Sequence, residues 1–305
     1  MNDKKTSVYR GVIVPMITPF TDRGKIDKIS AGKLIRYLIG NGTIPFILGT
    51  SGEVYSIAIE ERNVLVKTLL ESRKEGVPLI VGMGGLTFED TVRLSNQYFE
   101  WGIDTVVLTL PGYFALRDDQ IFQYFHELSG KINGDIILYN IPATIHNSLS
   151  VEVVNRLSRL ENIIGIKDSE FDENRMVESL KLWRNRDDFL YLVGVHELML
   201  QGLTLGANGL VPSTANLVPD LYNKMFALHL EGKYDEVEKI HVRTSEILSL
   251  YKNGHLLGES IAILKYLVSL SGLISPNMLP PLTGLTDEEK GDIYLKWEKI
   301  NIKLK

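Results

Sequence analysis

The chain contains no cysteine among its 305 residues. This absence excludes disulfides, thiolate metal sites and a cysteine nucleophile together, and it fits a reducing compartment. The sequence also lacks any run near the roughly 20 unbroken apolar residues of a membrane helix. Its start, Met1–Gly11, is polar and has no apolar core of a signal peptide. We therefore expect a cytoplasmic protein with no membrane partner.

An excess of positive charge is missing as well, because 38 acidic residues outnumber 33 lysines and arginines and leave a net charge of −5. Without a basic surface the chain cannot bind a polyanion by counterion release, so we expect no nucleic-acid partner. The 6 histidines include no i, i+4 pair beside an acid, so we expect no metal site. No G-x-S-x-G elbow is present, which leaves a serine hydrolase without support.

Short apolar runs rich in β-branched residues recur along most of the chain. Each is too short for a helix and too apolar for a half-exposed strand, which is typical of strands covered on both faces. The runs are Val12–Ile17, Phe46–Leu48, Leu79–Val81, Thr105–Leu110, Ile136–Leu138, Ile163–Ile166, Phe189–Val193 and Gly209–Val211. Amphipathic stretches of helical length lie between them, among them Ile29–Ile39, Glu60–Glu71, Val151–Leu160 and Met176–Trp183.

This alternation of strand and helix predicts an α/β fold, a closed (β/α)8 TIM barrel. An open doubly wound sheet is the alternative, but no G-x-G-x-x-G follows the first run and no Walker motif is present. After Val211 the strand pattern stops, and helical stretches follow at Leu217–Leu230, Tyr234–Tyr251, Leu257–Leu270 and from Thr286. We expect residues 1–230 to form the barrel and residues 231–305 to form a C-terminal helical extension packed on it.

Functional groups of such a barrel lie where its strands end. Lys167 follows the sixth run, and a buried amine without its proton is a nucleophile toward ketones. The structural alternative is a lysine that closes the strand and reaches solvent, paired with Asp168. Tyr139 follows the fifth run, where its phenol can relay protons beside an amine or can simply face water at the rim.

Three further segments follow strands. Gly-Thr-Ser-Gly-Glu at 49–53 offers N–H and O–H donors to a carboxylate, or else forms a helix cap with Glu53 as the reciprocal partner. Pro-Gly-Tyr at 111–113 adds a second phenol, and the eighth run ends in Val-Pro-Ser at 211–213. An amine, two phenols and a Thr-Ser loop on one predicted rim are the groups needed to hold a keto acid.

Several of these motifs, in this order, resemble the dihydrodipicolinate synthase / N-acetylneuraminate lyase superfamily, the class I pyruvate-dependent aldolases. The resemblance extends from about Gly11 to about Leu285. It rests on Gly-Val-Ile-Val-Pro-Met-Ile-Thr-Pro-Phe at 11–20, Gly-Thr-Ser-Gly-Glu at 49–53, Tyr-Asn-Ile-Pro at 139–142, Ile-Ile-Gly-Ile-Lys-Asp at 163–168 and Thr-Ala-Asn at 214–216.

The resemblance implies a role for each predicted site residue. Lys167 would form the Schiff base and Tyr139 would relay protons. Thr50 and Ser51 would bind the pyruvate carboxylate, and the backbone of Val211 would line the same pocket. We also expect a catalytic role for Thr50, which would help Tyr139 to shuttle the proton. The substrate would be held covalently on the lysine, so neither a cofactor nor a metal is expected.

Two further positions carry implications of the resemblance. Tyr113 matches a catalytic tyrosine that reaches across a subunit interface to complete the proton relay, which implies a homotetramer or a homodimer. Thr144 stands where the synthases carry an arginine that helps to bind aspartate semialdehyde, and His146 stands where the motif usually has glycine. Threonine cannot make the charge-assisted fork that arginine makes to a carboxylate. Both departures argue against the synthase activity.

The loop at 49–53, Glu-Glu-Arg at 60–62 and Leu-Pro-Pro at 279–281 look most like the 2-keto-3-deoxygluconate aldolases. We therefore expect a lyase that reversibly cleaves a 2-keto-3-deoxy sugar acid to pyruvate and an aldehyde, with Thr144 among the substrate-binding residues. One alternative is a 4-hydroxy-tetrahydrodipicolinate synthase, which condenses pyruvate with aspartate semialdehyde. Another is a barrel that binds a keto acid without turning it over.

Overall fold

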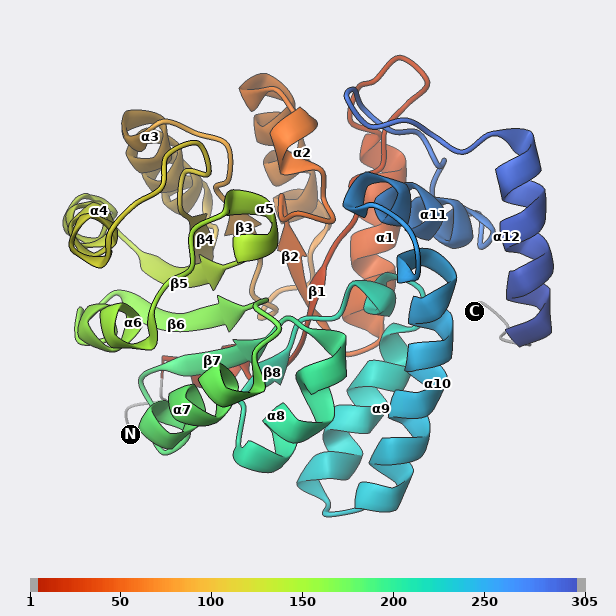
Figure 1. Ribbon diagram of the computed structural model, residues 1–305. Coiled ribbons are helices and arrows are strands. Elements are labelled where there is room, and N and C mark those ends of the chain that lie inside the picture. Colours follow the sequence, from red (N-terminus) through yellow and green to blue (C-terminus); the bar gives the residue numbers. More distant parts are fainter. Residues whose placement is uncertain (1–4, 301–305) are drawn as a thin grey trace. The chain divides into compact units, whose positions relative to one another are not determined.

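A computed structural model describes residues 5–300 of the chain. Its strands join in chain order, from β1 to β8, into one closed barrel. Strand β1 pairs with β8 in parallel, and the neighbouring strands from β3 to β8 are parallel as well. The strands are β1 (Gly11–Pro15), β2 (Ile44–Ile47), β3 (Ile80–Gly82), β4 (Thr105–Thr109), β5 (Asp135–Asn140), β6 (Ile163–Asp168), β7 (Leu190–Val193) and β8 (Gly209–Leu210). The predicted (β/α)8 barrel with helices after it is confirmed (Figure 1).

Helices alternate with these strands and continue beyond the last one. The α-helices are α1 (Lys28–Gly40), α2 (Ile59–Ser72), α3 (Phe88–Trp101), α4 (Asp118–Lys131), α5 (Pro142–Ile145), α6 (Val151–Leu157), α7 (Glu173–Trp183), α8 (Met199–Leu205), α9 (Pro219–Leu230), α10 (Tyr234–Lys252), α11 (Leu257–Ser269) and α12 (Asp287–Ile300). Short 3-10 turns lie at η1 (Ser7–Tyr9), η2 (Val54–Ser56), η3 (His196–Leu198) and η4 (Ser213–Asn216). Within residues 5–300, no helix is long and apolar enough to cross a membrane.

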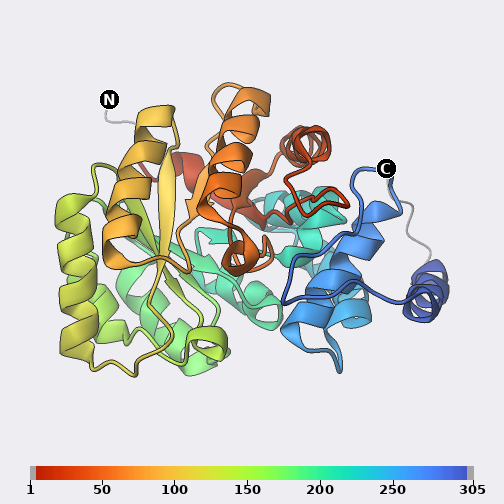
Figure 2. The same cartoon turned by 90° about the horizontal axis from the view of Figure 1, so that it is seen from above.

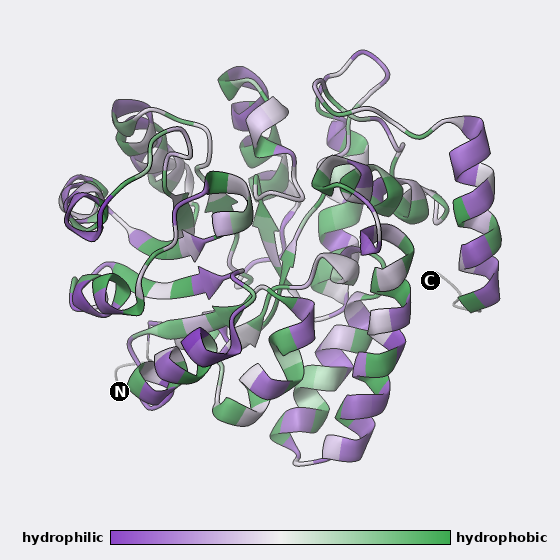
Figure 3. Ribbon diagram, in the orientation of Figure 1, coloured by the Kyte–Doolittle hydropathy of each residue, from purple (hydrophilic) through white to green (hydrophobic). Residues whose placement is uncertain are grey.

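The strands are apolar because they are covered on both faces, as their composition predicts. Every residue of β1, β2, β3, β6, β7 and β8 is buried. Figure 3 shows these strands largely in green, the colour of hydrophobic residues, whereas the end of β6 is purple. Polar residues at the end of a buried strand are costly unless they are hydrogen-bonded, so this end is the first place to look for function.

The chain divides into two compact units. The first joins the N-terminal segment through Ile13 with Gly76–Pro212, and the second joins Val14–Glu75 with the chain from Ser213 onward. The first unit therefore holds β3 to β8 with α3 to α8, and the second holds β2, α1, α2 and α9 to α12. The boundary between barrel and extension expected after residue 230 stays a prediction.

In the first unit, the register between β5 and β6 places functional side chains opposite each other. Tyr139 pairs with Lys167 and Asn140 pairs with Asp168. The register shifts between Ile136 and Ile137, and beyond this shift the two strands pair residue by residue to their ends. A Cβ on Gly165 of β6 would lie 2.7 Å from the Cβ of Leu190, so only glycine permits the close approach of β7.

In the second unit, α9 and α10 lie side by side, and α10 also packs against α11 and α12 (Figure 1). Seen from above, α12 lies at the outer edge of this unit (Figure 2). Most residues of α11 are buried, including Ile261, Leu264 and Leu267. Lys265 is the charged residue among the buried residues of this helix, and its side chain is 0% exposed. A buried ammonium requires a partner, which the second unit supplies at Glu53.

Candidate functional site

Lys167 and Tyr139 lie side by side on neighbouring strands. The sequence pattern placed both residues just after their strands. In the structure β5 continues to Asn140 and β6 to Asp168, so both residues lie inside the strands, near their ends. The Lys167 Nζ lies 3.8 Å from the centroid of the Tyr139 ring, and the two residues are 5% and 4% exposed. An amine over the face of a phenol is held there by the ring quadrupole when it is charged. The structure thus brings together the two residues with the strongest predicted roles.

The residues that follow them form a polar network. Successive side chains of a strand point to opposite faces, so Asn140 and Asp168 face away from Tyr139 and Lys167. Asn140 Nδ2 donates a hydrogen bond of 2.9 Å to Asp168 Oδ1. Arg175 of α7 forms a buried ion pair with the same carboxylate, with Nε 2.7 Å from Oδ2. Sequence reasoning did not assign a role to Asn140 or Arg175.

Tyr191 of β7 completes this network. Its hydroxyl donates to Asp168 Oδ2 at 3.3 Å. Burial, and after it the negative charge of Asp168, raises the pKa of Tyr191 well above its ordinary value. The phenol therefore keeps its proton at neutral pH and remains a donor to the carboxylate.

Three other predicted site residues belong to the same unit but differ in exposure. Val211 is buried, and its N–H donates to the Val193 carbonyl at 2.8 Å, which extends the pairing of β7 with β8. Thr144 lies exposed in the short helix α5, and its hydroxyl donates to the Ile141 carbonyl at 3.3 Å. Tyr113 is 89% exposed and packs edge-on against Phe114, with ring centroids 4.9 Å apart.

Thr50 and Ser51 belong to the second unit, in the loop that follows β2. Both are half-buried. The loop is held from both ends, because the Thr50 carbonyl accepts from Glu53 N at 3.1 Å and Thr18 Oγ1 donates to the Gly52 carbonyl at 2.7 Å. A Cβ on Gly52 would lie 3.0 Å from the Met16 carbonyl oxygen, which explains the glycine. These hydrogen bonds therefore define the backbone conformation of the loop.

Glu53 does not act as the reciprocal partner of a helix cap, so that interpretation is wrong. It has a left-handed backbone with φ of 58°, makes no side-chain cap, and lies 2.6 Å from Lys265 Nζ in a fully buried ion pair. Lys265 also donates to the Asn277 carbonyl and lies 4.2 Å from the Phe20 ring centroid. Burial raises the pKa of Glu53 and lowers the pKa of Lys265, while their mutual attraction opposes both shifts. No sequence motif had pointed to Lys265.

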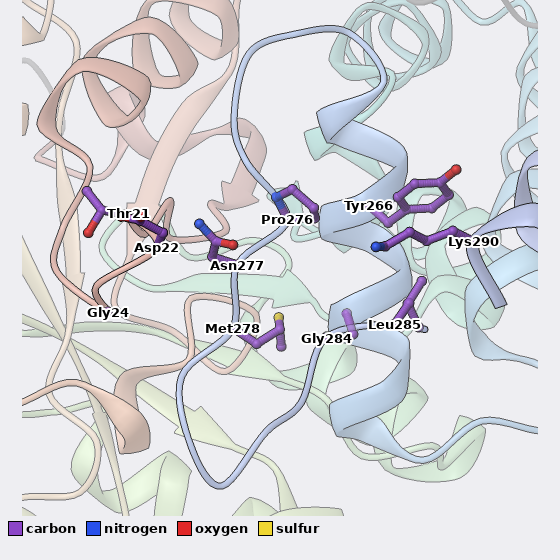
Figure 4. Close-up of a pocket in the computed structure, with 11 residues that line it drawn as sticks. Thr21, Asp22, Gly24, Tyr266, Pro276, Asn277, Met278, Gly284, Leu285 and Lys290 are labelled. Atoms are coloured by element: carbon purple, nitrogen blue, oxygen red, sulfur yellow. The ribbon is translucent and has the colours of Figure 1, made fainter. Parts of the chain in front are cut away.

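Among the described residues, neither a metal centre nor a hollow beside Tyr266 in the second unit adds to this set. Within residues 5–300, no group of three or more His, Cys, Asp and Glu side chains could hold a metal ion. A hollow of about 290 Å³ in the second unit is lined by Thr21, Asn277, Tyr266 and Lys290 among others (Figure 4). None of the predicted site residues lines it, and Lys290 already forms an ion pair with Asp287 at 2.9 Å.

Comparison with known proteins gives a consistent result at the level of the family. A model described as the dihydrodipicolinate synthetase family matches residues 8–296. The 4-hydroxy-tetrahydrodipicolinate synthase of Wigglesworthia glossinidia brevipalpis is 32% identical over 284 residues, which cover 92% of this chain and 93% of that protein. The protein of the same name from Buchnera aphidicola subsp. Schizaphis graminum is 30% identical over 300 residues, 96% of this chain and 100% of that protein.

Solved structures agree with the fold over almost the whole chain. Dihydrodipicolinate synthase DapA-2 from Bacillus anthracis superposes with a TM-score of 0.88 at 28% identity, covering 97% of this chain and 99% of that one. A prophage protein of the dihydrodipicolinic acid synthase family from E. coli K12, solved in complex with pyruvate, gives a TM-score of 0.90 at 25% identity, with coverage of 97% and 99%.

Proposed function

Because this chain belongs to the dihydrodipicolinate synthetase family, whose members are class I aldolases and lyases, we propose that it holds pyruvate as a Schiff base on Lys167. The observation that carries the proposal is the buried pair of Lys167 and Tyr139, with the amine 3.8 Å from the phenol ring. An amine nucleophile with a proton-relaying group beside it is the arrangement that Schiff-base chemistry needs. The pyruvate found in the E. coli relative supports the choice of keto acid.

In the proposed mechanism, neutral Lys167 attacks the C2 ketone of the substrate. Tyr139 passes protons to and from the carbinolamine, and loss of water gives an iminium ion. Tyr139 then takes the proton of the C4 hydroxyl, with Thr50 helping to shuttle it, while the electron pair of the C3–C4 bond moves toward the iminium. The bond breaks, C4 leaves as an aldehyde and an enamine of pyruvate remains. Protonation at C3 and hydrolysis then release pyruvate. Thr50 and Ser51 would bind the carboxylate, and the backbone of Val211 would line the pocket.

For the substrate, we propose a 2-keto-3-deoxy sugar acid. Thr144 supports this choice, because it is exposed and neutral where the synthases carry an arginine. A hydroxyl suits the hydroxyl groups of a sugar acid chain, whereas a carboxylate of aspartate semialdehyde would lose its charge-assisted partner. The names of the relatives favour the alternative, a 4-hydroxy-tetrahydrodipicolinate synthase.

A turnover assay separates these substrates. The purified protein is given 2-keto-3-deoxygluconate, N-acetylneuraminate, or pyruvate with aspartate semialdehyde, with the Lys167→Ala variant beside it. Lysine-dependent pyruvate release from the sugar acid is the expected result. Lysine-dependent consumption of aspartate semialdehyde would establish the synthase and reject the sugar acid. Failure of every substrate, with pyruvate still reducible onto the protein by borohydride, would indicate a keto-acid-binding barrel without turnover.

Thr144→Arg is the matched variant for specificity. It restores the guanidinium of the synthases at an exposed position, so the fold should tolerate it. We expect it to lower sugar acid cleavage about tenfold through lost or blocked contacts, which is the usual value of one specificity contact. An unchanged rate with all substrates would remove Thr144 from the substrate-binding set.

We also propose a homotetramer or homodimer in which Tyr113 reaches a partner subunit. Tyr113 and Phe114 are 89% and 66% exposed and stack on each other, which makes a neighbouring pair of exposed aromatic rings. Aromatic side chains are enriched in protein interfaces. Light scattering of wild type and of Tyr113→Ala tests the proposal, since a monomeric mass for wild type would contradict it.

A further inference from the structure

Two buried polar residues, Asn140 and Asp168, directly follow the proposed catalytic residues and have no part in the proposed chemistry. They are 0% and 3% exposed. Polar groups this deeply buried are costly unless they are hydrogen-bonded, so their partners indicate what they do. Their register on β5 and β6 is one residue beyond the pair of Tyr139 and Lys167.

Asn140 fastens the end of β5 to two other segments. Its Nδ2 donates to Asp168 Oδ1 on β6 and to Glu170 Oε2, both at 2.9 Å. Its Oδ1 accepts from Leu149 N at 3.0 Å, in the segment between α5 and α6. The side-chain amide therefore donates through Nδ2 and accepts through Oδ1, and these hydrogen bonds fix its orientation.

Arg175 fastens the same point from helix α7. Its Nε donates to Asp168 Oδ2 at 2.7 Å, and the side chain is 91% buried, because 9% of it is exposed. Its Nη2 is buried without a hydrogen-bond partner among the described residues. An unsatisfied donor lowers stability. The ion pairs of this buried arginine are made through Nε, which lies 2.7 Å from Asp168 Oδ2 and 3.5 Å from Glu170 Oε2.

We propose that Asp168, held by Asn140 and Arg175, is a positioning residue that fixes Lys167 against Tyr139. The backbone supports this clamp on the same residues, since Ser169 N donates to the Asn140 carbonyl at 2.9 Å and Gly194 N donates to the Asp168 carbonyl at 2.7 Å. With three elements fastened one residue beyond the reacting pair, the amine keeps its place over the phenol. A displacement of about 1 Å at a reacting group can cost about a hundredfold in rate.

This inference rests on the proposed function, and its closing experiment separates the two. The assay measures the rate at which borohydride traps pyruvate on wild type, on Asp168→Asn and on Leu180→Ala at saturating pyruvate. Leu180 is 1% exposed on the same helix as Arg175, so its truncation lowers stability without touching the clamp. We expect trapping and kcat to fall ten- to a hundredfold in Asp168→Asn, with a smaller change in KM, and to stay near wild type in Leu180→Ala.

The outcomes are distinct. Trapping on wild type with an equal rate on Asp168→Asn would overturn the clamp and leave the proposed function intact. No trapping on wild type would overturn the proposed function itself. Equal losses in Asp168→Asn and Leu180→Ala would show a structural effect only and also overturn the clamp.

A second pair of variants covers the case in which Asp168→Asn does not fold. Arg175→Lys keeps a positive charge near Asp168, whereas Arg175→Met leaves the carboxylate without its ion pair. We expect Arg175→Lys to rescue at least part of the trapping rate that Arg175→Met loses. Equal rates in the two variants would contradict the clamp, because a purely steric role would not distinguish them.

Discussion

Replacing Lys265 by methionine tests the energetics of the most deeply buried ion pair described in the second unit. Both side chains of the Glu53–Lys265 pair are 0% exposed, and the amine lies 2.6 Å from the carboxylate. Methionine has a similar length and flexibility, so it fills the space without a large cavity. The main effect of the substitution is therefore to leave the Glu53 carboxylate buried without its counter-charge.

The size of this effect follows from the burial. Removing one partner of a buried ion pair lowers the free energy of unfolding by about 3–5 kcal/mol, because an uncompensated charge remains. Replacing both partners by hydrophobic residues of similar volume is often close to neutral, and glutamine keeps the shape of Glu53 without its charge. The double variant Glu53→Gln/Lys265→Met should therefore recover most of what Lys265→Met loses. Lys290→Met, which breaks an exposed ion pair with Asp287, is the control and should leave stability nearly unchanged.

The pH dependence has a definite sign. Burial raises the pKa of Glu53, and in the wild type the charge of Lys265 opposes that rise. Without Lys265 the pKa of Glu53 rises further. A group whose folded pKa lies above its unfolded value loses stability as pH rises through the folded pKa and regains it as pH falls toward the unfolded value, about 4.3 for glutamic acid. The deficit of Lys265→Met should therefore shrink between pH 8 and pH 5.

Urea denaturation at these two pH values measures the effect, and the extrapolated free energies of the single and double variants are compared at each. If the double variant loses as much free energy of unfolding as Lys265→Met does, the explanation by an uncompensated charge is refuted. A deficit that grows as pH falls would refute the assigned sign.

Three further substitutions have outcomes that the structure predicts. Tyr139→Phe should lower kcat by about 10²–10⁴, as loss of a general acid–base group does, and a wild-type rate in steady-state kinetics would remove Tyr139 from the mechanism. Gly165→Ala should destabilise the protein by about 1–3 kcal/mol in urea, because its Cβ would lie 2.7 Å from the Leu190 Cβ, and unchanged stability would mean that β7 can move away. Asn216→Ala should cost about 1–3 kcal/mol, because the buried Ile17 N–H that donates to its side chain at 3.1 Å loses its partner, and a urea midpoint equal to that of wild type would contradict this.

The order of the strands could be predicted from the sequence because parallel barrel strands are buried on both faces and appear as short apolar runs. Their ends could not, because the runs were delimited by apolar residues. Lys167 and Asp168 are polar and yet belong to β6, since their hydrogen-bonding partners are supplied by the strand register and by α7. Composition cannot show that a charged residue will find a buried partner.

The candidate site was predictable where a single residue type implies chemistry. Lys167 and Tyr139 were found from their positions after apolar runs, and the structure brings them together. The helix-cap interpretation of Glu53 is wrong, although the spacing of Thr50 and Glu53 does fit a capping box. Its actual partner, Lys265, lies 212 positions away in the sequence. No local pattern can reveal a contact across such a separation.

The measurement that tests the central claim most directly is the mapping of pyruvate onto the chain. Wild-type protein is incubated with pyruvate, reduced with borohydride, digested and sequenced by mass spectrometry, with Lys167→Ala treated in parallel. We expect one modified residue, Lys167, in the peptide that carries Ile-Ile-Gly-Ile-Lys-Asp, and no modification in the variant. Modification at another lysine, or an unmodified wild-type protein, would contradict it.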